Sequence, residues 1–241
     1  KHKRDFKDSD LYVTMEPCTH FGVTPPCTNI IAKKGVKRVF FSFNDTDKRT
    51  KKKLKKELNK KKIKVYKKPI NNFHDFYQSY FSIHKNTTPY VDAKIATSRD
   101  YFTINKKSKW ITNYLSRNRA HLIRSEYEAI ISTSKSINRD NSLLNCRLEG
   151  FNNNKPDLII VDLNLRIKTK LNILNKMNKR KIFIATTVLK GKKISYLKQR
   201  GIRIIPIKSL KSKNDFIHFF KILKNYSYNR ILIESGLIFL N

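Results

Sequence analysis

Several features are scarce in this 241-residue chain, and each scarcity excludes a class of protein. Three cysteines are too few for a disulfide framework, and their low, odd number favours a reducing, intracellular setting. No apolar run approaches the length of a bilayer-spanning helix, and no segment resembles a signal peptide. No Gly-x-Gly-x-x-Gly follows a predicted strand, so a Rossmann dinucleotide site is not supported, although another fold can hold a nucleotide cofactor. We therefore expect a soluble cytoplasmic protein.

Acidic residues are also scarce, because 53 Lys and Arg stand against only 18 Asp and Glu, giving a formal net charge of +35. Such an excess occurs in proteins that bind phosphate backbones. Here lysine is spread over every segment, and few sites interleave basic residues with aromatic ones. The run from Lys48 to Lys68 has the apolar spacing of a solvated amphipathic helix rather than of a nucleic-acid-binding arm. We therefore predict neither a specific nucleic-acid partner nor a membrane partner.

The length of the chain allows a substantial core in one or two domains. The chain opens on lysine rather than methionine, and it ends where Glu234-Ser235-Gly236 looks like the start of a new helix. We expect a fragment at both ends. The polar segment around Asn86-Thr87-Thr88-Pro89 is the expected boundary between a first domain, 1–86, and a second domain, 87–241, that is incomplete at its C-terminus.

Strand and helix patterns alternate through both predicted domains, which favours α/β layered architecture with a mostly parallel sheet in the second. In the first domain the apolar runs predict strands at Leu11–Met15, Val36–Phe43 and Ile63–Tyr66, and helices at Cys27–Lys34, Lys51–Asn59 and Asn71–Lys85. In the second, strands are predicted at Tyr90–Ala96, Ala129–Ser132, Asp157–Asp162, Lys181–Ala185, Ile202–Ile205 and Arg230–Glu234, and helices at Tyr114–Ser125, Lys192–Arg200 and Asn214–Tyr226.

Two cysteines, Cys18 and Cys27, stand nine positions apart between a predicted strand and a predicted helix. Such a thiol pair suits Zn²⁺, because a helix N-terminus favours the deprotonated sulfur and the turn brings both ligands to one metal. Zinc deaminases carry a distant His-x-Glu before Pro-Cys-x-x-Cys, and the Glu moves protons for the metal-bound water. Here eight residues separate the cysteines instead of two. The alternative is a pair of buried structural cysteines in a turn.

The loop Glu16-Pro17-Cys18-Thr19-His20, closed by Thr24-Pro25-Pro26-Cys27, resembles the deaminase segment of the bifunctional riboflavin-biosynthesis deaminase–reductases. In that family Glu-Pro-Cys-x-His-x-Gly-x-Thr-Pro-Pro-Cys recurs. The motifs from Tyr90 onward are similar to the reductase half of the same family, in the same order. They are the segments 89–100, 108–112, 121–131, 139–147 and 231–236. Six motifs in order across two domains identify the chain as a member of this family.

The resemblance implies a partial cytidine-deaminase-like α/β domain followed by a dihydrofolate-reductase-like α/β domain. It also implies two consecutive steps of riboflavin synthesis on a small phosphorylated pyrimidine. In the first, a zinc-dependent hydrolysis removes an amine from a phosphoribosylamino-pyrimidinone. In the second, NADPH reduces the ribosyl chain to ribityl. The implied cofactors are therefore Zn²⁺ and NADPH.

The same resemblance assigns roles to individual residues of this chain. Cys18 and Cys27 would be zinc ligands. The cofactor would be bound by Ala96, Trp110, Ser136, Asp140 and Gly236. The substrate would be bound by Ser108, Arg124, Leu144, Arg147 and Glu234, with the two arginines holding its phosphate. Ordinary surface pairing is the alternative for each charged residue.

The largest departure from the family pattern lies at the front of the chain. The family's His-Ala-Glu is absent, and His2 is followed two places later by Arg4 rather than by Glu. We expect the third zinc ligand and the catalytic glutamate upstream of Lys1, so no deaminase catalytic residue is assigned within this chain. A nucleic-acid-directed base deaminase, a basic nucleic-acid-binding protein and a non-catalytic remnant remain as alternatives, and homo-oligomer formation is left open.

Overall fold

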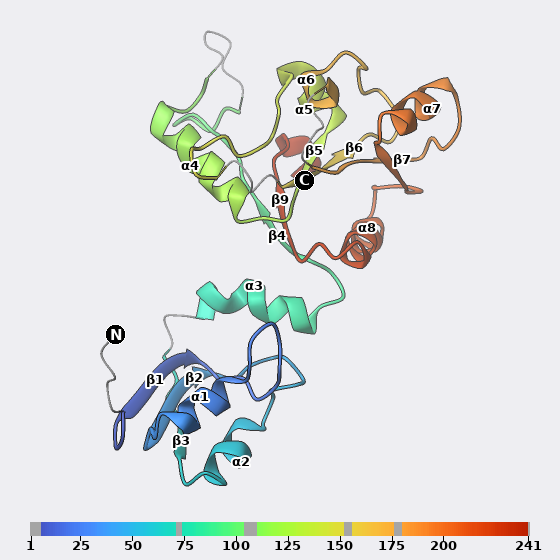
Figure 1. Ribbon diagram of the computed structural model, residues 1–241. Helices are drawn as coiled ribbons and strands as arrows, with labels where there is room; N and C mark the ends of the chain where they lie inside the picture. Colours follow the sequence, from blue (N-terminus) through green and yellow to red (C-terminus); the bar gives the residue numbers. More distant parts are fainter. Residues whose placement is uncertain (1–5, 71–73, 104–109, 152–155, 176–179, 241) are drawn as a thin grey trace. The chain divides into compact units, whose positions relative to one another are not determined.

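The computed structural model describes residues 6–70, 74–103, 110–151, 156–175 and 180–240. The chain folds as two compact units, Lys1–Asn86 and Thr87–Asn241 (Figure 1). Over these described ranges, no helix combines the length and the apolar character that crossing a membrane requires.

The first unit is a three-stranded parallel sheet with helices in its connections. Its strands are β1 (Asp10–Met15), β2 (Arg38–Phe43) and β3 (Lys64–Lys67), in that order across the sheet. Helix α1 (Cys27–Lys33) joins β1 to β2, α2 (Leu54–Asn59) joins β2 to β3, and α3 (His74–Lys85) follows. Parallel pairing requires crossover connections, and α1 and α2 are those crossovers.

One face of this sheet carries the core of the first unit. Alternate residues Val39 and Phe41 of β2 pack with Ile31 of α1 and with Leu54 and Leu58 of α2. The opposite face carries a row of three aromatic side chains in register across the strands. Their rings stack with centroids 4.6 Å (Tyr12–Phe40) and 5.1 Å (Phe40–Tyr66) apart. The period of two along each strand separates these two faces.

The second unit contains a six-stranded sheet in which every observed pairing is parallel. Its order is β4-β9-β5-β6-β7-β8, so the last strand in the chain lies between the first two. The strands are β4 (Tyr90–Ala93), β5 (Ala129–Thr133), β6 (Asp157–Val161), β7 (Ile182–Thr186), β8 (Arg203–Pro206) and β9 (Arg230–Ile233). The helices are α4 (Tyr114–Ser125), α5 (Ser134–Asp140), α6 (Asn172–Asn175), α7 (Lys192–Gln199), α8 (Lys213–Asn225) and α9 (Leu237–Leu240).

Helices cover both faces of this sheet, and a separate apolar cluster lies on each side. On one side Ile160 of β6 packs with Ile137 of α5 and Leu197 of α7. On the other side Ile159 of β6 and Phe183 of β7 pack with residues of α8, including Phe219. Burial on both faces explains why the strands read as continuous apolar runs rather than as alternating patterns.

The predicted α/β class with mostly parallel sheets is confirmed, and most predicted strands and helices lie within a few residues of the observed ones. Two boundaries were wrong. Helix α2 begins at Leu54 rather than Lys51, because Lys52 has a φ of 63° in the left-handed region that a helix cannot include. Strand β4 ends at Ala93 rather than Ala96, after which the backbone makes one more hydrogen bond, from Lys94 N to Ile233 O (2.9 Å).

Candidate active site

The carboxyl ends of β4, β9 and β5 meet at one edge of the second sheet, because these three strands are parallel neighbours. Lys94 directly follows β4, Glu234 directly follows β9, and Thr133 ends β5. The backbone of Glu234 is held on β5, with its N–H donating to Ile131 O (2.9 Å) and its carbonyl accepting from Ser132 Oγ (2.7 Å). Ligands of open parallel sheets bind at this kind of edge.

The carboxylate of Glu234 is buried, with 7% of its side chain exposed, and it is paired with two cations. Arg124 of α4 donates to it twice, Nε to Oε1 (2.5 Å) and Nη2 to Oε2 (2.9 Å). The ammonium of Lys94 lies 3.6 Å from Oε2. Burial by itself raises the pKa of Glu234, but the hydrogen bonds and charge of Arg124, together with Lys94, outweigh it and hold the pKa below its usual value. Glu234 is therefore a fixed anion at neutral pH.

The third nitrogen of Arg124 connects this ion pair to a loop that follows α5. Nη1 donates to Asn145 O (3.2 Å) and lies 3.4 Å from His121 Nδ1. His121 stands one turn before Arg124 on α4, and its Nδ1 also lies 2.9 Å from Asn145 O. Burial lowers the pKa of His121, and the nearby charges of Arg124 and Arg147 lower it further. The histidine is therefore neutral under ordinary conditions.

Arg147 completes this group from the other side and is exposed. Its Nη1 donates to Asn145 Oδ1 (2.8 Å), and its Nη2 lies 3.3 Å from His121 Nε2. No carboxylate pairs with Arg147 among the described residues. Arg147 thus presents a positive charge at the surface, whereas the charge of Arg124 is matched by Glu234.

A half-buried arginine, Arg180, supports the same loop, and no sequence motif singled it out. Arg180 donates to the carbonyl oxygens of Leu143, Leu144 (2.7 Å) and Pro156 (3.2 Å). Its burial lowers its pKa to about 10, so it is still charged at neutral pH. Leu144 itself is buried and has a positive φ of 48°, so its placement depends on this support. The residue type would have suggested a surface cation, and only the fold reveals its structural task.

The ends of β5 and β9 bring small and hydroxyl-bearing residues together. Thr133 Oγ1 accepts from Ser136 N (3.3 Å), and it lies 3.1 Å from Ser136 Oγ and 3.4 Å from Ser235 Oγ. Gly236 follows, and a Cβ atom added there would meet no heavy atom within 4 Å. Hydroxyls, backbone N–H groups and an open glycine suit the phosphates and ribose of a dinucleotide, so these residues fit such a cofactor.

The remaining predicted site residues are Asp140, Trp110, Ala96 and Ser108. Asp140 is exposed at the opposite end of α5 from Ser136, where it pairs with Arg139 (2.8 Å). Trp110 is 53% exposed, and the guanidinium of Arg117 lies 4.6 Å from its ring centroid. Ala96 lies in the segment after β4 and is half-buried. Ser108 lies outside the described residues.

The two cysteines of the first unit are adjacent. Cys18 Sγ and Cys27 Sγ lie 3.2 Å apart, and the backbone N–H of Cys27, at the start of α1, donates to Cys18 Sγ (3.1 Å). Burial and the contact with Cys18 raise the pKa of the Cys27 thiol. Two sulfurs on one tetrahedral zinc ion would stand about 3.8 Å apart, so a small separation of the side chains would admit the metal.

The residues around this pair do not complete a catalytic zinc site. His20 Nδ1 lies 2.9 Å from Thr50 Oγ1, and its Nε2 lies 3.9 Å from Asp47 Oδ2. Glu16 is buried and accepts from Asp45 N (3.0 Å), and burial raises its pKa. Within the described residues, no three His, Cys, Asp or Glu side chains are grouped closely enough to hold a metal. The fit to zinc is therefore limited to two ligands, whereas catalytic zinc sites use three.

Comparison with known proteins places this site in a family. Residues 89–241 match the RibD C-terminal domain. The chain is 30% identical over 233 residues to the riboflavin biosynthesis protein RibD of Aquifex aeolicus, covering 95% of this chain and 64% of that protein. It is 27% identical over 237 residues to the RibD of Actinobacillus pleuropneumoniae, covering 97% and 62%. The chain thus spans less than two thirds of the length of these relatives.

Solved structures agree. The chain superposes on Acinetobacter baumannii RibD with a TM-score of 0.75 at 26% identity, covering 96% of this chain and 64% of that one. A Thermotoga maritima diaminohydroxyphosphoribosylaminopyrimidine deaminase/5-amino-6-(5-phosphoribosylamino)uracil reductase gives a TM-score of 0.77 at 23% identity over 97% of this chain and 63% of that one, which shows the shared fold.

The second unit is an α/β domain with a parallel sheet, and charged and hydroxyl groups gather at the carboxyl ends of its central strands, where ligands of such sheets bind. The family match then makes the assignment specific. The chain belongs to the RibD C-terminal domain family.

Proposed function

We propose that residues 87–241 form a pyrimidine reductase domain of riboflavin biosynthesis. In this proposal the domain reduces the ribosyl chain of a phosphoribosylamino-pyrimidine to ribityl with NADPH. The family match and the printed names of the relatives support the pathway. The observation that carries the proposal is the buried Arg124–Glu234 pair at the sheet edge, with Lys94 beside it and Arg147 exposed nearby.

When bound, NADPH would supply a hydride to the sugar carbon, and the protein would mostly provide placement. Ser136 and Gly236 would hold the cofactor, with Ala96 and Trp110 as the further residues that the family resemblance assigns. Lys94 is the ammonium group nearest the fixed anion, and it can hold a proton at the edge of the site. Glu234, kept ionised and oriented by Arg124, can accept hydrogen bonds from substrate hydroxyl or ring N–H groups.

The family resemblance assigns both Arg124 and Arg147 to phosphate binding, but their contacts in the structure favour different roles. Arg124 spends two of its N–H donors on Glu234 and a third on Asn145, so we propose that it orients the site. Arg147 has exposed donors and no carboxylate partner among the described residues, so we assign the substrate phosphate to Arg147. A guanidinium can bind phosphate with two parallel hydrogen bonds.

Kinetics of Arg147→Ala test this assignment. Loss of a charge-assisted contact to phosphate should cost roughly 1.5–3 kcal/mol, which is about a 10- to 150-fold higher KM with kcat nearly unchanged. Arg147→Lys should recover part of the loss. The matched control is Arg119→Ala, an exposed arginine on α4, which should leave both parameters as in the wild type. An unchanged KM in Arg147→Ala would place the phosphate elsewhere.

We further infer that residues 1–86 are the C-terminal part of a zinc-dependent deaminase domain. The adjacent thiols of Cys18 and Cys27, within a loop of the family's spacing, support this inference. Cys18 and Cys27 would be two of the zinc ligands, and bound zinc would lower the pKa of a coordinated water. Because the described residues offer only two ligands, no deamination step is derived for this chain.

Metal analysis tests the zinc inference without an activity assay. We expect the 241-residue chain to bind zinc weakly and to lose it to a chelator, and Cys18→Ser and Cys27→Ser to abolish the remaining binding. Cys146→Ser is the matched control, since this buried cysteine lies in the other unit. Stoichiometric, chelator-resistant zinc together with ammonia release would show that a third ligand is present. Zinc uptake that survives both serine variants would exclude the cysteine pair.

A further inference from the structure

An arginine that no sequence motif singled out lies over the one tryptophan of the chain. Arg117 is the fourth residue of α4, and its guanidinium carbon is 4.6 Å from the centroid of the Trp110 ring. Its Nη1 also donates to Thr112 O (2.6 Å), in the segment that leads into the helix. Across the described residues, no acidic side chain forms an ion pair with Arg117. The guanidinium is therefore engaged by a ring and a carbonyl oxygen rather than by a carboxylate.

The start of α4 fixes the position of this guanidinium. Asn113 is the N-cap of the helix, and its Oδ1 accepts from Ser116 N (2.9 Å). The backbone N–H of Arg117 donates to Asn113 O (3.2 Å). Side chains of a helix are tilted toward its N-terminus, which explains why Arg117 reaches back to the residues before the helix. The orientation of the guanidinium is thus tied to that of α4.

The same face of α4 carries the residues of the candidate site. Arg117, His121 and Arg124 follow one another at spacings of four and three, which places them on one side of the helix. Arg124 makes two hydrogen bonds to the buried carboxylate of Glu234. Seven residues of helix rise only about 10 Å, and a helix is stiff over that distance. The contact of Arg117 therefore ties Trp110 to the same helix that orients Glu234.

Trp110 is not packed as a core residue would be. More than half of it is exposed, although the guanidinium of Arg117 lies over its ring. Stacking of a flat ligand on an indole depends on the orientation of the ring, because aromatic pairs prefer particular offset geometries. A cation over the ring is attracted by its π-electrons and can hold that orientation.

We infer that Arg117 is a positioning residue for the reductase. In this inference it holds the Trp110 ring in the orientation in which the ring contacts the nicotinamide cofactor, and Arg117 itself touches neither cofactor nor substrate. The inference rests on the proposed function and on the assignment of Trp110 to the cofactor. Removing Arg117 should then act on the KM for NADPH and leave the KM for the pyrimidine substrate unchanged.

The fluorescence of Trp110 tests the positioning without any cofactor, because no other tryptophan contributes to the signal. We expect Arg117→Ala to lower the anisotropy of this emission and to increase its quenching by acrylamide, since the ring loses the group that lies over it. Arg117→Lys keeps a cation within reach of the ring and should recover part of both changes. The matched control is Asn113→Ala, which removes the cap of the same helix but leaves the guanidinium, and it should stay close to the wild type.

NADPH titration then tests the consequence for the cofactor. The reduced nicotinamide absorbs where indole emits, so bound NADPH should quench Trp110 by energy transfer. A cation–π contact at a partly exposed site is worth enough to weaken NADPH binding, and to raise its KM, by about two- to fivefold in Arg117→Ala. Arg119→Ala removes an exposed charge from the same helix and should leave both values as in the wild type.

Three results in the variants would overturn the inference. Unchanged anisotropy and quenching in Arg117→Ala would mean that other contacts hold the ring. Equal changes in Asn113→Ala would reduce the effect to a loosened helix start. A freed ring with unchanged NADPH affinity and KM would leave Arg117 with a structural role alone. A wild-type chain that neither binds NADPH nor reduces the pyrimidine would overturn the proposed function and this inference with it, and that failure is recognised before any variant is compared.

Discussion

At the scale of single residues, the candidate site depends on side chains whose charge states are set by their neighbours. Glu234 would be a costly buried anion without Arg124 and Lys94, and with them it is held ionised. His121 is the opposite case, because burial and two arginines keep it neutral. A neutral histidine can donate from one ring nitrogen to Asn145 O and accept at the other from Arg147, whereas a charged one would repel both guanidinium groups.

The depressed pKa of His121 predicts a dependence of stability on pH. In the unfolded chain this histidine binds a proton near its ordinary pKa of about 6.5, whereas in the folded chain it binds the proton only at lower pH. The contribution to stability is therefore fully present above about pH 6.5 and is lost as the pH falls below that value. We expect the free energy of unfolding, measured with urea between pH 7.5 and 5.5, to fall less steeply with decreasing pH in His121→Asn than in the wild type. Glu234 does not interfere, because its pKa is below 4.5 and its contribution is lost only at lower pH.

The matched control for this experiment is His218→Asn, because His218 is an exposed histidine on α8. This variant should keep the wild-type slope. A slope that is equal in the wild type and in His121→Asn would mean that protonation of His121 is not resisted by the fold.

At the scale of elements, the candidate site depends most on the position of the loop between α5 and β6. It carries Leu144, Asn145 and Arg147, and its described residues, 141–151 and 156, form neither helix nor strand. Arg180 donates hydrogen bonds to three carbonyl oxygens of this loop, and Arg124 donates one to a fourth, Asn145 O. The loop is therefore fastened between two guanidinium groups.

Replacing Arg180 should loosen this loop and thereby affect the site at a distance. Arg180→Ala leaves the carbonyls of Leu143, Leu144 and Pro156 without their donor, at a cost of about 1–3 kcal/mol in the free energy of unfolding. We also expect a higher KM for the substrate, because Arg147 loses its fixed position. Denaturant unfolding measures the first effect and steady-state kinetics the second, with Arg203→Ala, an exposed arginine on β8, as control. A destabilised variant with an unchanged KM would separate the loop from substrate binding.

At the scale of the whole molecule, the net charge of +35 governs encounters with polyanions. The charge is mostly lysine, whose ammonium is a point charge on a flexible stem and lacks the rigid fork with which arginine recognises base edges. We predict loose, non-selective binding of duplex DNA, single strands and tRNA at low salt, lost as salt approaches physiological levels through counterion release. Fluorescence titrations at two salt concentrations measure this.

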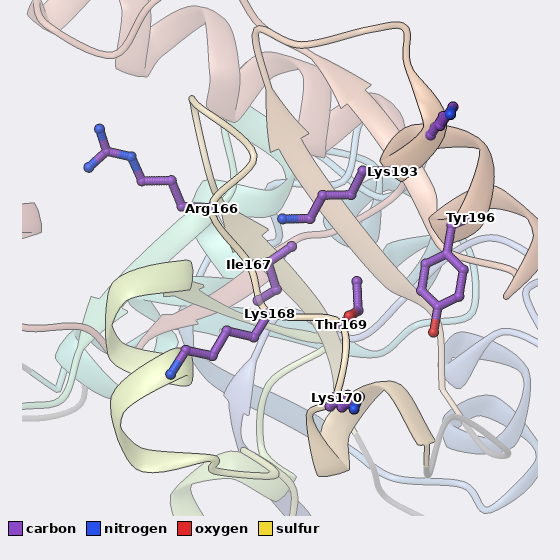
Figure 2. A pocket seen from close by; sticks show the side chains of 8 residues that line it. Arg166, Ile167, Lys168, Thr169, Lys170, Lys193 and Tyr196 are labelled. Atoms are coloured by element: carbon purple, nitrogen blue, oxygen red, sulfur yellow. The ribbon is translucent and has the colours of Figure 1, made fainter.

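One local concentration of this charge is a hollow lined by residues 166–170 and by Lys192, Lys193 and Tyr196 of α7 (Figure 2). Tight binding of one nucleic acid at physiological salt, with clear preference over the others, would instead support the nucleic-acid-directed alternative for the basic surface.

The sequence by itself determined the family and most elements of the fold, although it missed the short helices α5, α6 and α9. The apolar run 158–161 is buried on both faces of the sheet, and such a strand can be predicted without tertiary information because every residue in the run is apolar. The spacing of Cys18 and Cys27 likewise predicted their proximity, since a short turn between a strand and a helix leaves them few other placements.

Only the tertiary structure decided which residues meet at the sheet edge. Arg124 and Glu234 are 110 positions apart, and they pair because β9 inserts between β4 and β5. The role of Arg180 was equally hidden, because in a sequence so rich in lysine and arginine an arginine that binds carbonyl oxygens cannot be told from any surface cation. Strand order and long-range hydrogen bonds arise from packing the whole sheet at once, and local residue patterns do not record them.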